Sequence, residues 1–184
     1  MLARWQAGGI DAVTVTSAET LDNLAALLGT SCGVAALEGA ELGNAGQSSC
    51  VQAVLDWFGP TDFLQMDKQF SGTSCPVTHD AANSPESMLL GAAIQTVPEK
   101  AKSANPITYV TANAPAFLIQ HGMADPVVPV QQSIGLAENL KRICGEDRVV
   151  LELFEGFEHG DRRFDSPVNV KRVLDFLDGH LKGS

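Results

Sequence analysis

Two loops of the chain place an acid and a base where they could carry out chemistry. Asp125 lies in AFLIQHGMADPVVP, just after an apolar segment, and two prolines stiffen its loop. His159 lies in VVLELFEGFEHGD, after another apolar segment and between two glycines. An aspartate beside a histidine is the orienting half of a nucleophilic triad, because the carboxylate fixes the imidazole tautomer and stabilises its charged form. We therefore predict that Asp125 orients His159 as a general base.

Ser17 is the candidate nucleophile for this pair. The stretch VTVTSAETLDNLAALLG, residues 13–29, reads as an apolar strand, then Ser17, then a helix. The chain order serine, aspartate, histidine is one in which such triads occur. At the helix N-terminus the amide of Ala18 would be placed to stabilise an oxyanion, aided by the helix dipole.

Ser17 has a second interpretation, as the cap of that helix. Thr16 could cap it instead, with Glu19 three residues later completing a capping box. A nucleophile at a sharp strand-to-helix turn normally has glycines two residues to either side, whereas this chain has Val15 and Glu19. Both interpretations stay open. Three further serines could reach the site from the neighbouring loop: Ser31, Ser48 and Ser49.

The other histidines and the aromatic residues fit structural roles. We expect His121 to be a turn or packing residue, His79 to lie in a long insert, and His180 to be solvated on the last helix. Four aromatic residues could line an acyl or aryl pocket, but core packing is the preferred interpretation: Trp57, Phe58, Phe63 and Phe70.

Alternating strand and helix patterns must position these residues. The predicted strands are Asp11–Thr16, Val51–Trp57, Ala116–Gln120 and Val149–Phe154. The predicted helices are Ala18–Leu28, Glu86–Ile94, Val130–Ile143 and one that opens at Pro167 after a cap at Ser166 or Asp165. This alternation predicts a mainly parallel sheet, with VVLELF at an edge because its apolar residues alternate. The loops after parallel strands meet at one sheet edge, where ligands bind.

The chain length of 184 residues suits a single domain over 1–184. Between the second and third predicted strands, residues 59–115 are rich in Gly, Pro, Ser and Asn, with one predicted helix, which indicates a lid-like insert. Residues 33–49 form a second polar, glycine-rich loop.

The overall charge argues against several partners. With a net charge of −10, nucleic acid and anionic membrane surfaces are poor partners. We expect no membrane span, because no long uncharged apolar run occurs, and no secretory signal is visible at the N-terminus, which fits a cytoplasmic protein as expressed. The four cysteines form no CxxC pair, so free thiols are expected; a disulfide, most plausibly between Cys50 and Cys75, would need an oxidising compartment.

Longer motifs resemble the esterase/lipase branch of the α/β-hydrolases that includes feruloyl-esterase-like enzymes. HGMADPVVP and EGFEHG look like that family's acid and base regions, and VQAVLDWFGPTDF, SPESMLLGA and ANPITYVTANAPAFLIQHG strengthen the similarity, which runs over about residues 24–181. The resemblance implies Asp125 as the acid, His159 as the base and no metal or organic cofactor.

The beginning of the chain departs from that pattern. The family's Gly-x-Ser-x-Gly motif precedes the helix written here as LAALLGTS. In this chain the position of the motif's serine is occupied by Glu19. The earlier strands and the glycine-rich HGG-type loop, which supplies an oxyanion-hole amide, are not found. Residues 1–23 look foreign to the family, and the first 29 residues resemble a segment of uroporphyrinogen-III synthase, as in a fusion.

These expectations combine into a partial α/β-hydrolase fold. It would be a small, mainly parallel sheet of about four strands flanked by helices, without the N-terminal half of the parent sheet. The expected function is a carboxylesterase-type serine hydrolase for short-chain or aryl esters, with Ser17, Asp125 and His159 as the triad. A catalytically impaired remnant is the alternative, and tetrapyrrole synthesis is a third, weakly supported one. The exposed sheet edge predicts a homodimer or larger homo-oligomer.

Overall fold

A computed structural model of the chain describes residues 29–30, 32–34, 50–70 and 77–181. The predicted strand Asp11–Thr16, the helix after it and the candidate residues Ser17 and Ala18 lie outside the described residues, as do the alternatives Ser31, Ser48 and Ser49. The described strands are β1 (Ala53–Trp57), β2 (Ala116–Gly122) and β3 (Val149–Phe154). The α-helices are α2 (Met66–Gln69), α3 (Pro85–Leu90), α4 (Pro98–Ser103), α5 (Gln131–Cys144) and α6 (Pro167–Leu181).

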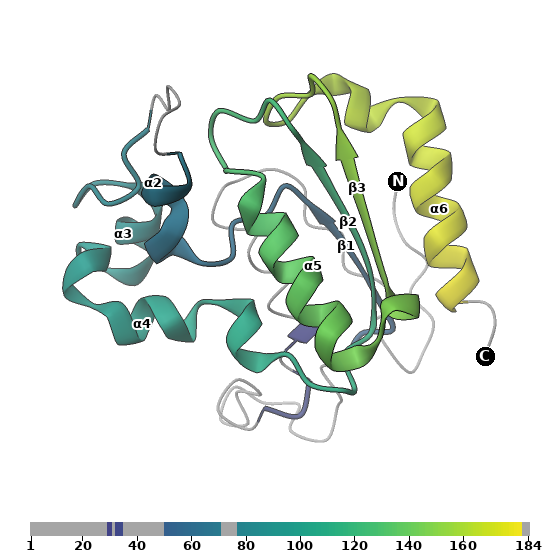
Figure 1. Cartoon of the computed structure of the whole chain (residues 1–184), viewed down its shortest axis with the longest axis horizontal. Coiled ribbons are helices and arrows are strands. Elements are labelled where there is room, and N and C mark those ends of the chain that lie inside the picture. The colour runs from purple at the N-terminus through teal and green to yellow at the C-terminus, as the bar shows by residue number, and fades with distance from the viewer. Residues whose placement is uncertain (1–28, 31, 35–49, 71–76, 182–184) are drawn as a thin grey trace, which may run out of the picture.

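The described strands form a parallel sheet in the order β1-β2-β3 (Figure 1). The predicted bounds of β3 are confirmed, and those of β1 and β2 are within two residues of the observed ones. Within the described sheet β3 lies at an edge, as its alternating pattern predicts. A parallel sheet flanked by helices is the α/β architecture that the sequence predicts.

The central strand β2 is buried at all of its 7 positions, because helices cover both faces of the sheet. Phe117 and Ile119 pack with Leu136 and Leu140 of α5 on one face. Leu118, which lies between Phe117 and Ile119 in sequence, points to the other face of the sheet. There it packs with buried side chains of α6. Figure 1 shows α5 in front of the sheet and α6 on the other side. This two-sided burial explains why β2 reads as a continuous apolar run.

Helix α6 begins where its sequence predicts, and α5 begins within one residue of its predicted start. Helix α6 starts at Pro167, and the hydroxyl of Ser166 accepts a hydrogen bond from the Asn169 amide at 3.3 Å, so Ser166 is the cap. The predicted start of α5 at Val130 is one residue early, since the helix runs over Gln131–Cys144.

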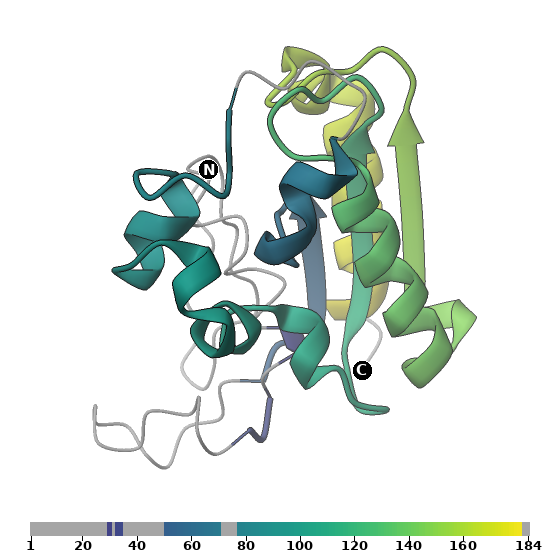
Figure 2. The same ribbon diagram turned by 60° about the vertical axis from the view of Figure 1, so that its left-hand side comes forward.

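The insert between β1 and β2 contains more helix than the sequence predicts. It holds α2, α3, α4 and three 3₁₀ segments, Phe63–Gln65, Ile94–Thr96 and Pro106–Tyr109. The predicted helix Glu86–Ile94 is wrong in its bounds, because Gly91 adopts φ 73° and ends α3 in a left-handed cap. Figure 2 shows the insert standing to one side of the sheet.

The insert has a small apolar core of its own. Phe63, Met66 and Ile94 pack together with Val128, which belongs to the loop after β2. The insert is thereby joined to the loop that carries Asp125.

The expectation of free thiols is wrong for Cys32 and Cys50, and so is the alternative pairing of Cys50 with Cys75. Cys50 pairs with Cys32, not with Cys75, which lies outside the described residues. Gly29 approaches the side chains of Val54 and Phe117 so closely that a Cβ there would lie 2.5 Å from Val54 Cγ2. This contact brings Gly29, three residues before Cys32, beside β1, and the Cα atoms of Cys32 and Cys50 are 4.8 Å apart. Cys144 is a free, half-buried thiol.

Among the described residues, no helix combines the length and the apolar character needed to cross a membrane.

Candidate active site

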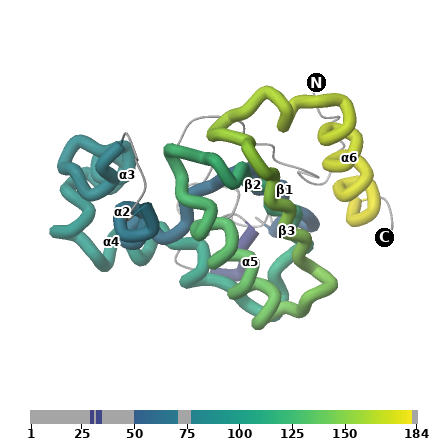
Figure 3. The backbone as a smooth tube through the Cα atoms, turned by 45° about the horizontal axis from the view of Figure 1, so that its top comes forward, coloured from purple at the N-terminus to yellow at the C-terminus, as the bar shows by residue number. Residues whose placement is uncertain are grey.

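The loops after β2 and β3 meet at the carboxyl edge of the sheet, shown from above in Figure 3. Asp125 and His159 therefore lie side by side, with Nδ1 of His159 2.8 Å from Oδ2 of Asp125. This is the hydrogen bond that the sequence predicts. The carboxylate accepts it, so the proton lies on Nδ1 and Nε2 is the basic nitrogen.

Backbone contacts hold the two loops together. The amide of Met123 donates to the Phe154 carbonyl at 2.9 Å, and the amide of Ala124 donates to the Phe157 carbonyl at 3.0 Å. Gly122 makes this approach possible, because a Cβ there would lie 2.3 Å from the Phe157 oxygen. The acid and base loops are consequently held in one fixed arrangement.

The Asp125 carboxylate is saturated with hydrogen bonds. Its side chain is completely buried, and its Oδ1 accepts the amides of Val127 and Val128, each at 2.8 Å. Burial alone would raise its pKa, but the contacts with His121 and His159 and the backbone amide of Val128 outweigh this and lower the pKa to about 2. The group is therefore a stable anion beside the imidazole of His159.

The loop around His159 is shaped by two glycines and closed by an arginine. Gly156 and Gly160 adopt φ 69° and 63°, conformations that side chains disfavour. Arg163 spans the loop: it donates to the Gly156 carbonyl at 2.6 Å, pairs with Asp161, and lies 3.9 Å over the ring centre of Phe157. His159 is left with a side chain that is 19% exposed, so its imidazole is within reach of a substrate.

Phe58 packs directly against the imidazole of His159. Their ring centres are 4.6 Å apart in an edge-on arrangement, and Phe58 is buried. Phe58 is the single described residue other than glycine with a positive φ, at 45°. Such strain persists only where the surroundings enforce it, and here the Phe58 amide donates to the Gln120 carbonyl at 2.9 Å. The expected core role is thus combined with a contact to the base.

His121 is a site residue that sequence reasoning missed. It is fully buried at the end of β2, with Nδ1 2.7 Å from Ser133 Oγ and Nε2 3.0 Å from the Val128 carbonyl. Its Nε2 also lies 3.3 Å from Oδ2 of Asp125. A sequence signal existed, because His121 and Asp125 flank the same turn at the end of a strand, but packing was the expected role.

Gln132 attaches the insert to the first turn of α5. It is almost completely buried, and its Oε1 accepts the amides of Thr61 and Asp62, each at 2.7 Å. Its Nε2 donates to the Asp62 carbonyl at 3.1 Å and to Gln69 at 2.6 Å. No feature of the sequence distinguishes Gln132 from its neighbour Gln131.

The remaining histidines have other side-chain partners than Asp125 and His159. His79 is buried in the insert, where its Nδ1 is 2.9 Å from Glu86 Oε1, and His180 is exposed on α6 beside Phe176. Within the described segments, no group of three or more His, Cys, Asp or Glu side chains is arranged to hold a metal ion.

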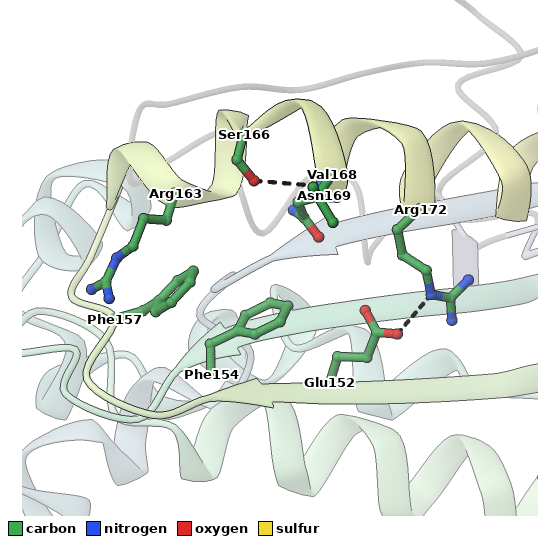
Figure 4. A pocket seen from close by; sticks show the side chains of 8 residues that line it. All are labelled: Glu152, Phe154, Phe157, Arg163, Ser166, Val168, Asn169 and Arg172. Atoms are coloured by element: carbon green, nitrogen blue, oxygen red, sulfur yellow. Dashed lines mark hydrogen bonds and ion pairs between the residues drawn. The ribbon is translucent and has the colours of Figure 1, made fainter.

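Described residues line one hollow at the Asp125 loop and another beside the loop after β3. One of about 270 Å³ lies between α2 and the Asp125 loop and includes Phe70, Met123 and Asp125 in its lining. The other, of about 490 Å³, lies between β3 and α6 (Figure 4). Its charged and amide groups are engaged with one another or with neighbours: Glu152 with Arg172, and Asn169 with Gln120.

Comparisons with known proteins show which family the chain belongs to. A family model described as BD-FAE matches residues 13–140. The chain is 28% identical over 103 residues to a probable carboxylic ester hydrolase, LipM, and 32% identical over 115 residues to the esterase LipC, both of Mycobacterium tuberculosis. These alignments cover 56% and 62% of this chain but 22% and 27% of the relatives, so the chain spans about a quarter of their length.

A solved structure shares both the fold and a recognisable sequence. A truncated form of a carbohydrate esterase from gut microbiota is 30% identical and superimposes with a TM-score of 0.72, covering 88% of this chain and 56% of that chain. The family match begins at residue 13. It therefore overlaps the first 29 residues, for which the sequence predicts a resemblance to uroporphyrinogen-III synthase. That expectation falls on residues outside the described structure.

Proposed function

Because the chain belongs to the BD-FAE family of esterase-like α/β-hydrolases, we propose that it is a carboxylesterase-type serine hydrolase. The observation that carries this proposal is the 2.8 Å contact between a buried aspartate and a partly exposed histidine at the carboxyl edge of a parallel sheet. The proposed substrates are short-chain or aryl esters. The relatives support the reaction class, since two are named as ester hydrolases and one structure as a carbohydrate esterase.

In the proposed mechanism His159 acts as general base and then as general acid. Ser17 Oγ attacks the ester carbonyl carbon while Nε2 of His159 takes the hydroxyl proton. The tetrahedral oxyanion receives a hydrogen bond from the amide of Ala18, and its collapse expels the alcohol with the proton from His159. Water, deprotonated by the same imidazole, then hydrolyses the acyl-enzyme. Asp125 stabilises the imidazolium in both steps.

A catalytically impaired hydrolase is the alternative, and one sequence observation favours it. Val15 and Glu19 stand where glycines would relieve crowding around a nucleophile, and Glu19 adds a negative charge near the oxyanion. In this alternative Ser17 is a helix cap, and Asp125 and His159 keep their geometry without turnover.

Two further proposals concern the rest of the molecule. The insert over residues 59–115 would act as a lid, because its apolar core includes Val128 of the acid loop. The chain would also assemble into a homodimer or larger homo-oligomer through an exposed sheet edge.

A labelling experiment tests the proposed function. The protein is incubated with p-nitrophenyl acetate and, separately, with a fluorophosphonate probe, and any adduct is located by mass spectrometry. We expect turnover that disappears in His159→Ala and in Ser17→Ala, and an adduct on Ser17. An adduct on Ser31, Ser48 or Ser49 would move the nucleophile to the neighbouring loop. Turnover no higher than that of His159→Ala would favour the impaired hydrolase.

A further inference from the structure

His121 contacts Asp125 but takes no part in the reaction proposed above. It lies at the end of β2, fully buried, and approaches Oδ2 of Asp125 at 3.3 Å, the same oxygen that His159 contacts at 2.8 Å. A carboxylate oxygen between two imidazoles is held from two directions. What His121 contributes depends on which of its ring nitrogens carries the proton.

The neighbours of His121 determine that tautomer. Nε2 faces two acceptors, the Val128 carbonyl at 3.0 Å and the Asp125 carboxylate at 3.3 Å, so this nitrogen must carry a proton. Nδ1 lies 2.7 Å from the hydroxyl of Ser133, which can donate. The neutral imidazole with its proton on Nε2 therefore satisfies every contact, and no charge needs to be buried.

The same contacts close a ring around the acid turn. The Val128 amide donates to Oδ1 of Asp125 at 2.8 Å, while the Val128 carbonyl accepts from His121. Any rotation of the carboxylate therefore has to break the contact with His121 or the bond to Val128. Ser133, in the first turn of α5, fixes the imidazole from its other side.

We propose that His121, held by Ser133 as the neutral Nε2–H tautomer, is a positioning residue that aims the Asp125 carboxylate at His159. It does not touch the substrate and acts through Asp125. This inference uses the pair Asp125 and His159 of the proposed function but does not depend on the identity of the nucleophile.

Nuclear magnetic resonance tests the proposal without any turnover. The proton on Nδ1 of His159, shared with Asp125, should give a low-field signal, and two-bond proton–nitrogen correlations should show His121 protonated at Nε2. In His121→Gln and His121→Phe we expect the low-field signal of His159 to weaken or disappear while the amide spectrum remains that of a folded protein. Ser133→Ala should show the same trend in smaller degree, and Ser133→Thr, which keeps a hydroxyl, should restore the signal.

A stability-matched control separates positioning from general destabilisation. Leu140→Ala removes buried apolar volume from α5, so it should lower the melting temperature and leave the low-field signal unchanged. If the protein hydrolyses p-nitrophenyl acetate, His121→Gln should lower kcat on the order of 10²-fold with KM unchanged. If the protein does not turn over, the proposed function fails but the spectra still decide this inference.

Two results would overturn it. One is a wild-type spectrum in which His121 is protonated at Nδ1 alone, and this measurement stands even if the variants do not fold. The other is a folded His121→Gln or His121→Phe protein whose His159 signal equals that of Leu140→Ala.

Discussion

Asp125 shows how a single buried charge can be made stable. Both of its oxygens accept hydrogen bonds, Oδ1 from two backbone amides and Oδ2 from His159, with His121 close by. The carboxylate is therefore bound more tightly in its ionised form than a free aspartate would be. The same contacts that suit it to orient a base also link its ionisation to the stability of the fold.

We predict an acid-sensitive stability that depends on Asp125. Its pKa falls from 3.8 in the unfolded chain to about 2 in the folded protein. The stabilisation is fully present above pH ~4 and is lost as the pH falls through about 2, by about 2 kcal/mol. Chemical unfolding of wild type and Asp125→Asn between pH 6 and pH 2 measures it. The free energy of unfolding of Asp125→Asn should lack this component of the pH dependence. If the free energy of unfolding falls equally steeply with decreasing pH in both proteins, Asp125 is not its source.

A second prediction concerns the residues beside Ser17. Val15→Gly and Glu19→Gly together would relieve crowding at the turn and remove a charge that repels the oxyanion, so acylation should rise more than tenfold if Ser17 is the nucleophile. Each glycine should cost roughly 0.5–1 kcal/mol of stability. Acylation rates and melting temperatures are compared for the parent, the two single variants and the double variant. A lower melting temperature with no gain in acylation rate would show that Ser17 is a helix cap and not the nucleophile.

At the level of elements, the site rests on the two-sided burial of β2. Its side chains alternate between the α5 face and the α6 face, and its last residues lead into the acid loop. Strands β2 and β3 and helices α5 and α6 could be predicted from the sequence because each has an apolar run or an apolar periodicity that fits its type of element. The pairing of Asp125 with His159 could be predicted because both follow parallel strands, and because their motifs resemble the acid and base regions of the family.

Other elements could not be predicted for identifiable reasons. The helices of the insert are short and interrupted by proline or by the left-handed Gly91, so no periodic pattern develops. His121 was missed because a histidine inside an apolar strand resembles a packing residue, and its partner Ser133 comes from a different element.

We predict that the hydrogen bonds of Gln132 hold the insert against α5. Gln132→Ala would leave the buried amides of Thr61 and Asp62 without their acceptor, at a cost of about 1–3 kcal/mol for each unpaired group. We expect faster proteolytic cleavage within residues 59–115. Limited trypsin digestion with mass spectrometry measures the rate and the sites of cleavage. Gln131→Ala, at the exposed neighbouring position, is the matched control and should be cleaved like wild type. Equal cleavage of both variants would show that the insert is held elsewhere.

For the molecule as a whole, the disulfide is a covalent link between two parts of the chain that precede β1. Cys32 and Cys50 are 18 residues apart in sequence, and their Cα atoms lie 4.8 Å apart. Spacing along the chain could not identify this pair, because it depends on how the folded chain brings the two cysteines together, as in the close approach of Gly29 to Val54 and Phe117.

Reduction of this disulfide should destabilise the protein measurably. Closing a loop of this length stabilises a fold by about 3 kcal/mol through the unfolded state. Cys32→Ser with Cys50→Ser, and wild type in dithiothreitol, should therefore show the same lowered melting temperature. Cys144→Ser is the control and should leave the transition where it is, since Cys144 is a free thiol. A melting temperature that dithiothreitol does not change would contradict the prediction.

The backbone bonds that join the acid and base loops have a consequence for how such a site can evolve. The amides of Met123 and Ala124, the close approach at Gly122 and the loop closure by Arg163 all lie within the segment from β2 to η6 (Arg162–Asp165). These contacts come from one continuous stretch of the chain, although Phe58, just after β1, also touches the base. Because the bonds of Met123 and Ala124 use the backbone, such a site tolerates new side chains at these two positions better than it tolerates an insertion or deletion in either loop.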